Sequence, residues 1–143
     1  MRSWHDFHID GYAVDGIQRQ VSFSLVWPYK TPNDVHRARI VFEDVEAYFL
    51  EHDLGSSIVY EFSEQPLSTF LEEWTDRFEI GATYGWPRFW RPVPYPRRTV
   101  ETEREDALRL LIERNVKCIE LGSSYGMSGW VLAAKVREEW LDV

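Results

Sequence analysis

Residues 20–27 read Gln-Val-Ser-Phe-Ser-Leu-Val-Trp, and the alternation within them is the clearest indication of how this chain folds. Large apolar side chains occupy every second position, and serine fills two of the positions between them. Such alternation is typical of a β-strand with one buried face and one face nearer to water. The pair Asp15-Gly16 precedes it and suits the tight type I′ turn of a hairpin. We therefore expect a β-hairpin early in the chain.

Further segments share this strand character. Residues 37–43 alternate after a loop at residues 29–35, and residues 58–62 alternate after a Gly-Ser-Ser turn. Residues 116–122 and 129–140 are two apolar segments joined by a glycine-rich connection. Because that connection contains no helical pattern, a hairpin is favoured over a parallel crossover. These segments predict antiparallel strands.

Two segments have helical periodicity. Residues 66–78 carry apolar side chains at intervals of three and four, which predicts an amphipathic helix packed on the sheet. The members of this stripe are Leu67, Phe70, Leu71, Trp74 and Phe78. Thr102 and Glu105 match a capping box, so a second helix is predicted at residues 103–114, with Asn115 as its stop.

These elements predict one α+β domain over residues 1–143. Its core is a largely antiparallel, twisted sheet of about six strands, with the two helices packed on one face. Residues 44–53 combine helical spacing with β-rich neighbours, and we expect a turn or a short helix there. No repeat or linker indicates a second domain.

The charge balance limits the classes of partner that the chain can be expected to bind. The chain has 24 acidic and 16 basic residues, for a formal net charge of −8. Nucleic-acid affinity depends on neutralising phosphates, so a nucleic-acid partner is disfavoured and a basic protein is favoured. No apolar run is long enough to cross a membrane, and no secretory leader is evident, which predicts a cytoplasmic protein without a membrane partner. The one cysteine, Cys118, has apolar neighbours and predicts a buried thiol in a reducing compartment.

Residues 86–98 differ from the rest of the chain. They read Trp-Pro-Arg-Phe-Trp-Arg-Pro-Val-Pro-Tyr-Pro-Arg-Arg and hold four of the 7 prolines and four of the 16 basic residues. We call them the basic segment. Three roles fit its composition: a lid on the core, a protein-binding loop, and a platform for single-stranded nucleic acid or a nucleotide. The acidic balance of the chain argues against the third.

A protein-binding role gives specific candidate residues, because Trp, Tyr and Arg dominate binding hot spots. In the basic segment the predicted contacts are Trp86, Phe89, Trp90, Arg91 and Tyr95. The acidic residues predicted to support them electrostatically are Glu43, Asp44 and Asp53.

A metal-dependent enzyme is the alternative. Asp6, His8 and Asp10 would share one face of a strand and could contribute to a metal or acid–base site. Residues two apart on a strand lie roughly 7 Å apart, however, so a bulge and further ligands such as His36 or His52 would be needed. A homo-oligomeric structural subunit, paired through a sheet edge or the basic segment, is a further alternative.

Four motifs in chain order resemble small bacterial immunity-type proteins of polymorphic toxin systems. They are His5-Asp-Phe-His8, Val21-x-Phe-x-Leu25, Arg39-Ile-Val-Phe-Glu-Asp-Val-Glu-Ala-Tyr48 and Cys118-Ile-Glu-Leu-Gly-Ser-Ser-Tyr-Gly-Met-Ser-Gly-Trp-Val-Leu-Ala133. The resemblance implies a non-enzymatic, cytoplasmic and often acidic protein that inactivates a toxin domain by binding it. The charge balance adds that this domain would be basic, and no cofactor is predicted. It transfers no functional residue, because these groups share no catalytic motif.

Overall fold

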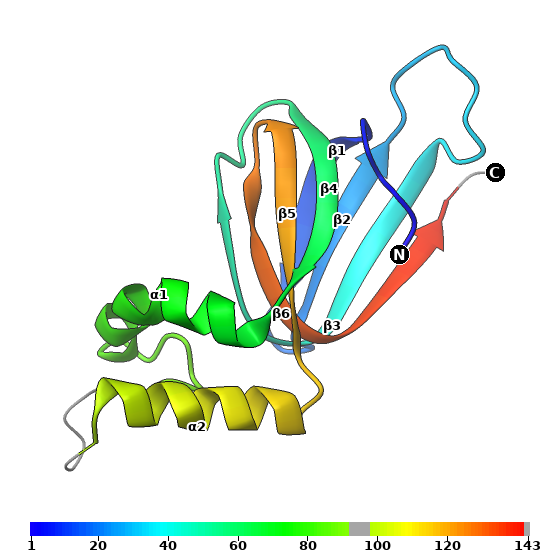
Figure 1. Cartoon of the computed structure of the whole chain (residues 1–143). Helices are drawn as coiled ribbons and strands as arrows, with labels where there is room; N and C mark the ends of the chain where they lie inside the picture. Colours follow the sequence, from blue (N-terminus) through cyan, green and yellow to red (C-terminus); the bar gives the residue numbers. More distant parts are fainter. Residues whose placement is uncertain (92–97, 142–143) are drawn as a thin grey trace.

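A computed structural model describes residues 1–91 and 98–141 and contains, within them, six strands and two helices (Figure 1). In chain order they are β1 (His8–Asp15), β2 (Gln20–Val26), β3 (Arg37–Glu51), β4 (Ser57–Gln65), α1 (Leu67–Ala82), α2 (Val100–Glu113), β5 (Lys117–Tyr125) and β6 (Ser128–Trp140). The predicted α+β class, the antiparallel strands and the two helices are confirmed. No described helix is long and apolar enough to cross a membrane.

The sheet closes into a barrel with the strand order β1-β2-β3-β6-β5-β4, so the prediction of an open twisted sheet was wrong. Closure occurs where β1 meets β4, with Ile9 opposite Ser57. Beside this pair the backbones of Phe7 and Val59 bond at 2.9 Å, the Val59 amide donating to the Phe7 carbonyl. The long β3 strand carries a bulge between Val45 and Ala47, and bulges bend and twist strands in the way closure requires.

The early hairpin is confirmed, but its turn is longer than a type I′ turn. Asp15 pairs with Gln20, which leaves residues 16–19 as a four-residue loop. The Asp15 carboxylate accepts hydrogen bonds from the amides of Ile17 (3.1 Å) and Gln18 (3.0 Å). The left-handed conformation falls on Arg19, with φ of 55°, and not on Gly16. Four-residue loops of this kind are common hairpin connections, and this one places Ile17 at its tip.

Residues 44–53 were predicted as a turn or short helix, and this prediction was wrong, because residues up to Glu51 continue β3. Both faces of this part of the strand are covered. Tyr48 and Leu50 pack against the barrel interior, whereas Ala47 and Phe49 pack against the helices. A strand buried on both faces loses the apolar–polar alternation by which a strand is recognised.

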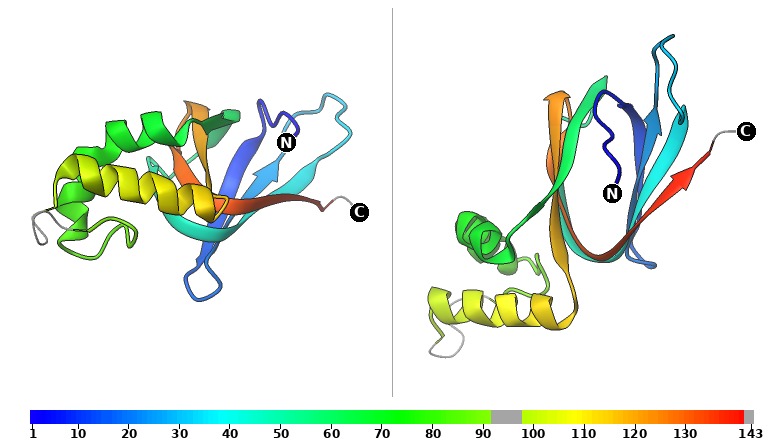
Figure 2. Two further views of the ribbon diagram at one scale, coloured as in Figure 1. Left: turned by 60° about the horizontal axis from the view of Figure 1, so that its bottom comes forward. Right: turned by 45° about the vertical axis from the view of Figure 1, so that its right-hand side comes forward.

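The apolar side chains form two clusters. One fills the barrel, and its largest fully buried members are Trp4, Phe7, Phe23 and Phe42. The other lies between the helices and the outside of the barrel (Figure 2) and contains Phe70, Phe78, Trp90, Leu111 and Trp130. We call the second one the helix–barrel core. It is the layer that positions the basic segment.

The two helices depart from prediction at their ends. All five residues of the α1 stripe pack in or against the helix–barrel core, and α1 continues past Phe78 to Ala82. α2 begins at Val100, earlier than predicted, because Thr99 caps it by accepting from the Thr102 amide at 3.1 Å. The predicted capping box at Thr102 therefore lies inside the helix. Asn115 follows the helix end at φ of 59°, as its predicted stop role requires.

Candidate protein-binding site

The first part of the basic segment, Trp86 to Arg91, folds back against the end of α1. The Trp86 amide donates to the Gly81 carbonyl at 3.0 Å, and the Trp90 amide donates to the Pro87 carbonyl at 3.1 Å. Gly81 permits this approach, since a Cβ there would lie 2.3 Å from the Trp86 carbonyl oxygen. The path of the segment is therefore set by backbone contact with α1.

Two of the predicted contact residues are buried. Trp90 is 3% exposed, and its indole donates to the Glu79 carboxylate at 2.6 Å. Phe89 is also buried, with its ring centroid 5.8 Å from that of Phe78. Both rings lie in the helix–barrel core and do not face a partner in this conformation. This part of the segment acts as a lid.

Trp86 occupies an intermediate position. Its ring stacks on Trp130, with centroids 6.1 Å apart and planes at 27°, and meets Phe78 edge-on at 5.5 Å. Part of the indole stays accessible, because Trp86 is only half-buried and lines a hollow beside it. Trp86 is therefore the predicted aromatic contact that reaches the surface.

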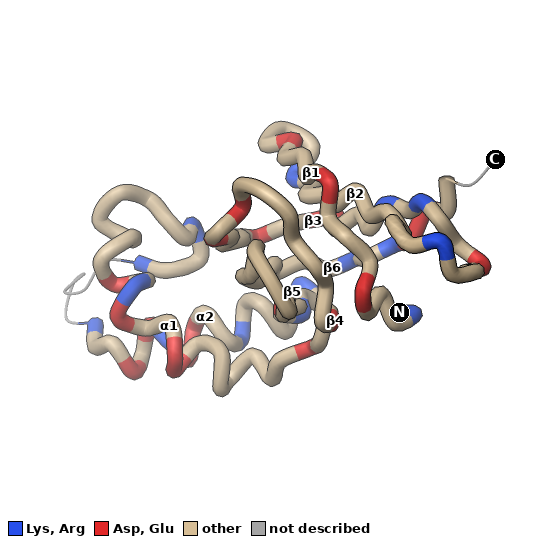
Figure 3. The backbone as a smooth tube through the Cα atoms, turned by 90° about the horizontal axis from the view of Figure 1, so that it is seen from above, with Lys and Arg blue, Asp and Glu red and all other residues tan. Residues whose placement is uncertain are grey.

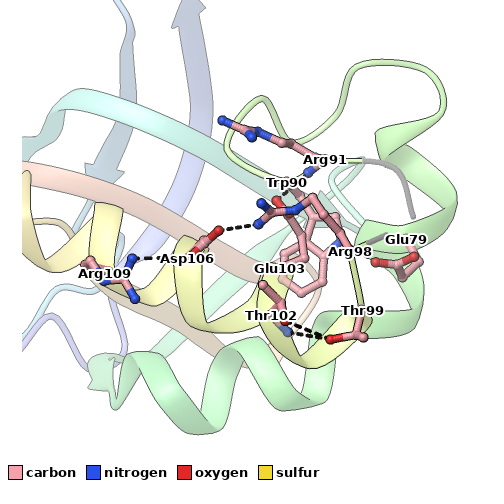
Figure 4. Close-up of polar contacts among 9 residues, drawn as sticks. All are labelled: Glu79, Trp90, Arg91, Arg98, Thr99, Thr102, Glu103, Asp106 and Arg109. Carbon is pink, nitrogen blue, oxygen red and sulfur yellow. Dashed lines mark hydrogen bonds and ion pairs between the residues drawn. The ribbon is translucent and has the colours of Figure 1, made fainter. Parts of the chain in front are cut away.

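One buried carboxylate on α2 bonds to both Arg91 and Arg98 (Figure 4). Glu103 on α2 is 1% exposed; it accepts from the Arg91 amide at 2.6 Å and from the Arg98 guanidinium at 2.8 Å. Arg98 also pairs with Asp106, and this hydrogen bond lowers the pKa of Asp106 and raises that of Arg98. The predicted contact Tyr95 lies outside the described residues. The Arg91 side chain is exposed.

A hollow of about 430 Å³ lies between the β1–β2 loop, β3 and the start of the basic segment. We call it the hairpin groove, and its lining includes Val14, Ile17, Arg19, Tyr48, Trp86 and Arg88. Ile17 is 91% exposed at the tip of the loop, which leaves a large apolar side chain in water at the rim. The groove thus combines aliphatic, aromatic and cationic side chains from three parts of the chain.

An ion-pair network braces one wall of the groove. The Glu46 side chain is almost fully buried and pairs with Arg19 at 3.1 Å and with Arg114 at 2.9 Å. Arg19 also donates to the Val45 carbonyl at 3.0 Å. The network ties the hairpin loop to β3 and to the end of α2. Arg88, in contrast, is exposed and has no ion-pair or hydrogen-bond partner within the part of the chain that the structure describes.

The predicted acidic residues are spread along β3 and the loop that follows it. Glu43 pairs with Arg137 at 2.8 Å and Asp44 with Lys135 at 3.7 Å, so neighbouring cations on β6 partly neutralise both. Asp53 lies beyond the end of β3, where it accepts from a tyrosine hydroxyl at 2.6 Å. Figure 3 shows acidic and basic residues interspersed over both the barrel and the helices.

In the structure, His8 and Asp10 of the metal-enzyme alternative contact other side chains. The His8 imidazole lies 3.2 Å from the Tyr29 hydroxyl, and Asp10 pairs with Arg37 at 3.0 Å. Burial raises the pKa of Asp10, but hydrogen bonds from Ser24 and Arg37 outweigh it and hold the pKa below its usual value. Among residues 1–91 and 98–141, no group of three or more His, Cys, Asp or Glu side chains could hold a metal ion.

Cys118 lies in the helix–barrel core. Burial, with help from nearby carboxylates, raises the pKa of its thiol to about 12. The thiolate is the reactive form of cysteine, so this side chain acts as an apolar packing group.

Most residues of the groove were not predicted from the sequence. Trp86 was predicted as a contact, but Ile17, Tyr48, Glu46 and Arg88 were not, because they lie far apart in the sequence and meet only in the folded chain. One signal was present: Ile17 follows Asp15-Gly16, so a large apolar residue sits where a turn should be polar.

No protein family matches this chain, and no curated protein or solved structure is significantly similar to it. Its function must be inferred from the groove itself.

Proposed function

We propose that this chain is a non-enzymatic protein-binding domain that holds its partner at the hairpin groove. The observation that carries the proposal is Ile17, which is 91% exposed on a short loop beside an aromatic-lined hollow. When a partner covers a large apolar side chain that was exposed to water at the rim of a hollow, the removal of that apolar surface from water stabilises the complex.

The groove is organised before binding. Asp15 hydrogen bonds fix the loop that carries Ile17, and the Glu46 ion pairs fix the wall beneath it. Trp86 is held by its stack on Trp130. Preorganised side chains lose little entropy on docking, and exposed Trp and Arg are typical hot-spot residues.

The open shape of the groove and the exposed side chain at its rim favour a protein as the ligand over a small molecule. Small ligands are usually buried over about 70–90% of their surface inside an enclosed site. Here Ile17 projects from the tip of a loop at the edge of an open hollow. A partner that inserts one apolar side chain into the hollow and packs its neighbouring surface over Ile17 would use both features.

The partner's chemistry follows from charge. The net charge of −8 favours a basic protein, because long-range complementarity raises the association rate. Arg88, which pairs with none of the described residues, offers its guanidinium at the rim to a carbonyl or carboxylate oxygen beside the inserted side chain. Occlusion of a basic toxin domain, the role implied by the resemblance to immunity-type proteins, is one form of this function and belongs to the same proposal.

Site-specific photo-crosslinking in the native cell tests this proposal while the partner is still unidentified. A photoreactive phenylalanine analogue at position 17 is expected to form one defined adduct with another protein. The matched control places the analogue at Leu54, which is also 91% exposed but lies in the β3–β4 connection. No adduct from position 17, or the same adducts from both positions, would contradict the proposal.

A further inference from the structure

β6 is longer than the strand on one of its sides. It pairs with β3 as far as Trp140, opposite Ala38, whereas its pairing with β5 ends at Ala133, opposite Lys117. Residues 134–140 therefore have one edge that no strand of the described chain pairs with. Figure 2 shows this end of β6 running past the helices with no strand along its outer side.

The alternation of backbone hydrogen bonds along β6 shows which backbone groups face that edge. The Leu141 amide donates to the Arg37 carbonyl at 2.9 Å, so Leu141 bonds toward β3. Backbone groups on an antiparallel strand bond alternately to one side and the other. The odd-numbered residues of this stretch thus bond toward β3. The even-numbered ones, from Ala134 to Trp140, turn their amides and carbonyls toward the open edge.

We propose that this edge is a self-association surface, on which the edge of a second copy of the chain adds as an antiparallel strand. The two copies are related by a twofold axis at Arg137, and the sheet continues across it. An exposed edge of unpaired backbone groups is a ready template for an added strand. A twofold axis brings identical surfaces together, so the edge has to be complementary to itself.

The side chains of the edge meet that condition. Around an axis at Arg137, Lys135 lies opposite Glu139 of the second copy, and this pair occurs twice. Within its own copy Lys135 also pairs with Asp44 at 3.7 Å and Glu139 with Arg39 at 3.2 Å, so the cross-copy pairs extend ion pairs that already exist. Opposite charges facing each other across strands stabilise pairing, so the charges select this register and do not block it. Val136 and Trp140, 41% and 57% exposed, add apolar surface.

The two Arg137 side chains that meet at the axis are already neutralised. Each guanidinium pairs within its own copy with Glu43 at 2.8 Å and with Glu139. The repulsion between them is therefore weaker than that between two free cations. In this register the edge-facing backbone groups of Val136 and Glu138 lie opposite each other across the axis, so each gains a partner.

Two separate proline substitutions test whether this edge mediates self-association. The Val136 amide faces the open edge, whereas the Arg137 amide bonds to β3. Purified wild-type protein is expected to pass from dimer to monomer over a dilution series followed by light scattering. Val136→Pro is expected to stay monomeric. At a concentration at which the wild type is also monomeric, its midpoint of thermal unfolding is expected to match that of the wild type, because the substitution removes only an edge amide. Arg137→Pro is expected to lower that midpoint, because it breaks the β3–β6 ladder.

Charge reversal and cysteine crosslinking test the register. Lys135→Glu and Glu139→Lys are each expected to raise the dimer dissociation constant by about tenfold, since two cross-strand pairs become repulsive. The double variant is expected to recover part of the lost affinity, because the cross-strand pairs become attractive again while Arg39 and Arg137 lose Glu139 within their own copy. Arg137→Cys should form a disulfide between copies, since the position faces itself in a non-hydrogen-bonded pair, and Lys135→Cys should not.

A wild-type chain that stays monomeric up to millimolar concentration overturns the proposal. So does a dimer that survives Val136→Pro or that crosslinks at position 135 in place of 137. These measurements use the purified chain alone. Their outcome is therefore independent of whether a partner binds the hairpin groove.

Discussion

Replacing Trp130 with alanine is expected to lower the free energy of unfolding by about 3–5 kcal/mol, the range for truncating a large buried aromatic side chain. The indole is 2% exposed and lies at the centre of the helix–barrel core. Its ring contacts Phe70 at 4.7 Å, Trp74 at 5.0 Å and Trp86 at 6.1 Å between centroids. Loss of the ring leaves a cavity between β6 and both α1 and the groove wall.

Chemical denaturation of the wild type and variant measures this change. Tyr125→Ala is the matched control, because this aromatic residue lies on the neighbouring strand β5 but is 66% exposed. The control is expected to stay within about 1 kcal/mol of the wild type. If Trp130→Ala lowers the free energy of unfolding no more than Tyr125→Ala does, the helix–barrel core does not hold the helices against the barrel.

Replacing Glu103 with alanine is expected to cost about 2–4 kcal/mol of stability. Removing one member of a buried ion pair typically costs about 3–5 kcal/mol, and Asp106 retains part of the hold on Arg98. The substitution leaves the Arg91 amide and one edge of the Arg98 guanidinium without their acceptor. Trypsin is expected to cleave after Arg98 faster, because that end of the basic segment is released from α2.

Glu105→Ala is the matched control, since this glutamate is exposed on the same helix, two residues along. It is expected to leave the unfolding free energy within about 0.5 kcal/mol of the wild type and the cleavage rate unchanged. Equal effects of the two substitutions would show that Glu103 is not the clamp of the basic segment.

Local patterns predicted much of the fold. The alternation in residues 20–27 and the helical stripe from Leu67 to Phe78 each depend on one buried face, and both predictions are confirmed. The alternation pattern did not identify the strand where both of its faces are buried, as at residues 44–50. Barrel closure was not predictable, because it depends on a pairing between residues as distant in sequence as Ile9 and Ser57.

The candidate site was predictable only in part, because it too depends on contacts between residues that are distant in the sequence. Composition identified the basic segment, but its aromatic residues divide between two environments. Trp90 packs in the helix–barrel core, where Glu79, eleven residues earlier, accepts the hydrogen bond of its indole, and the sequence does not reveal that partnership. The hairpin groove requires Ile17, Tyr48 and Trp86 to meet, and only the folded barrel brings them together.

The central claim is that a protein partner binds at the hairpin groove. Its most direct test is the affinity of the crosslinked partner, once purified, for two variants with equally exposed targets: Ile17→Ser and Leu54→Ser. We expect Ile17→Ser to weaken binding at least tenfold, about 1.4 kcal/mol, and Leu54→Ser to change it less than about twofold. Equal affinities of the two variants would contradict the account.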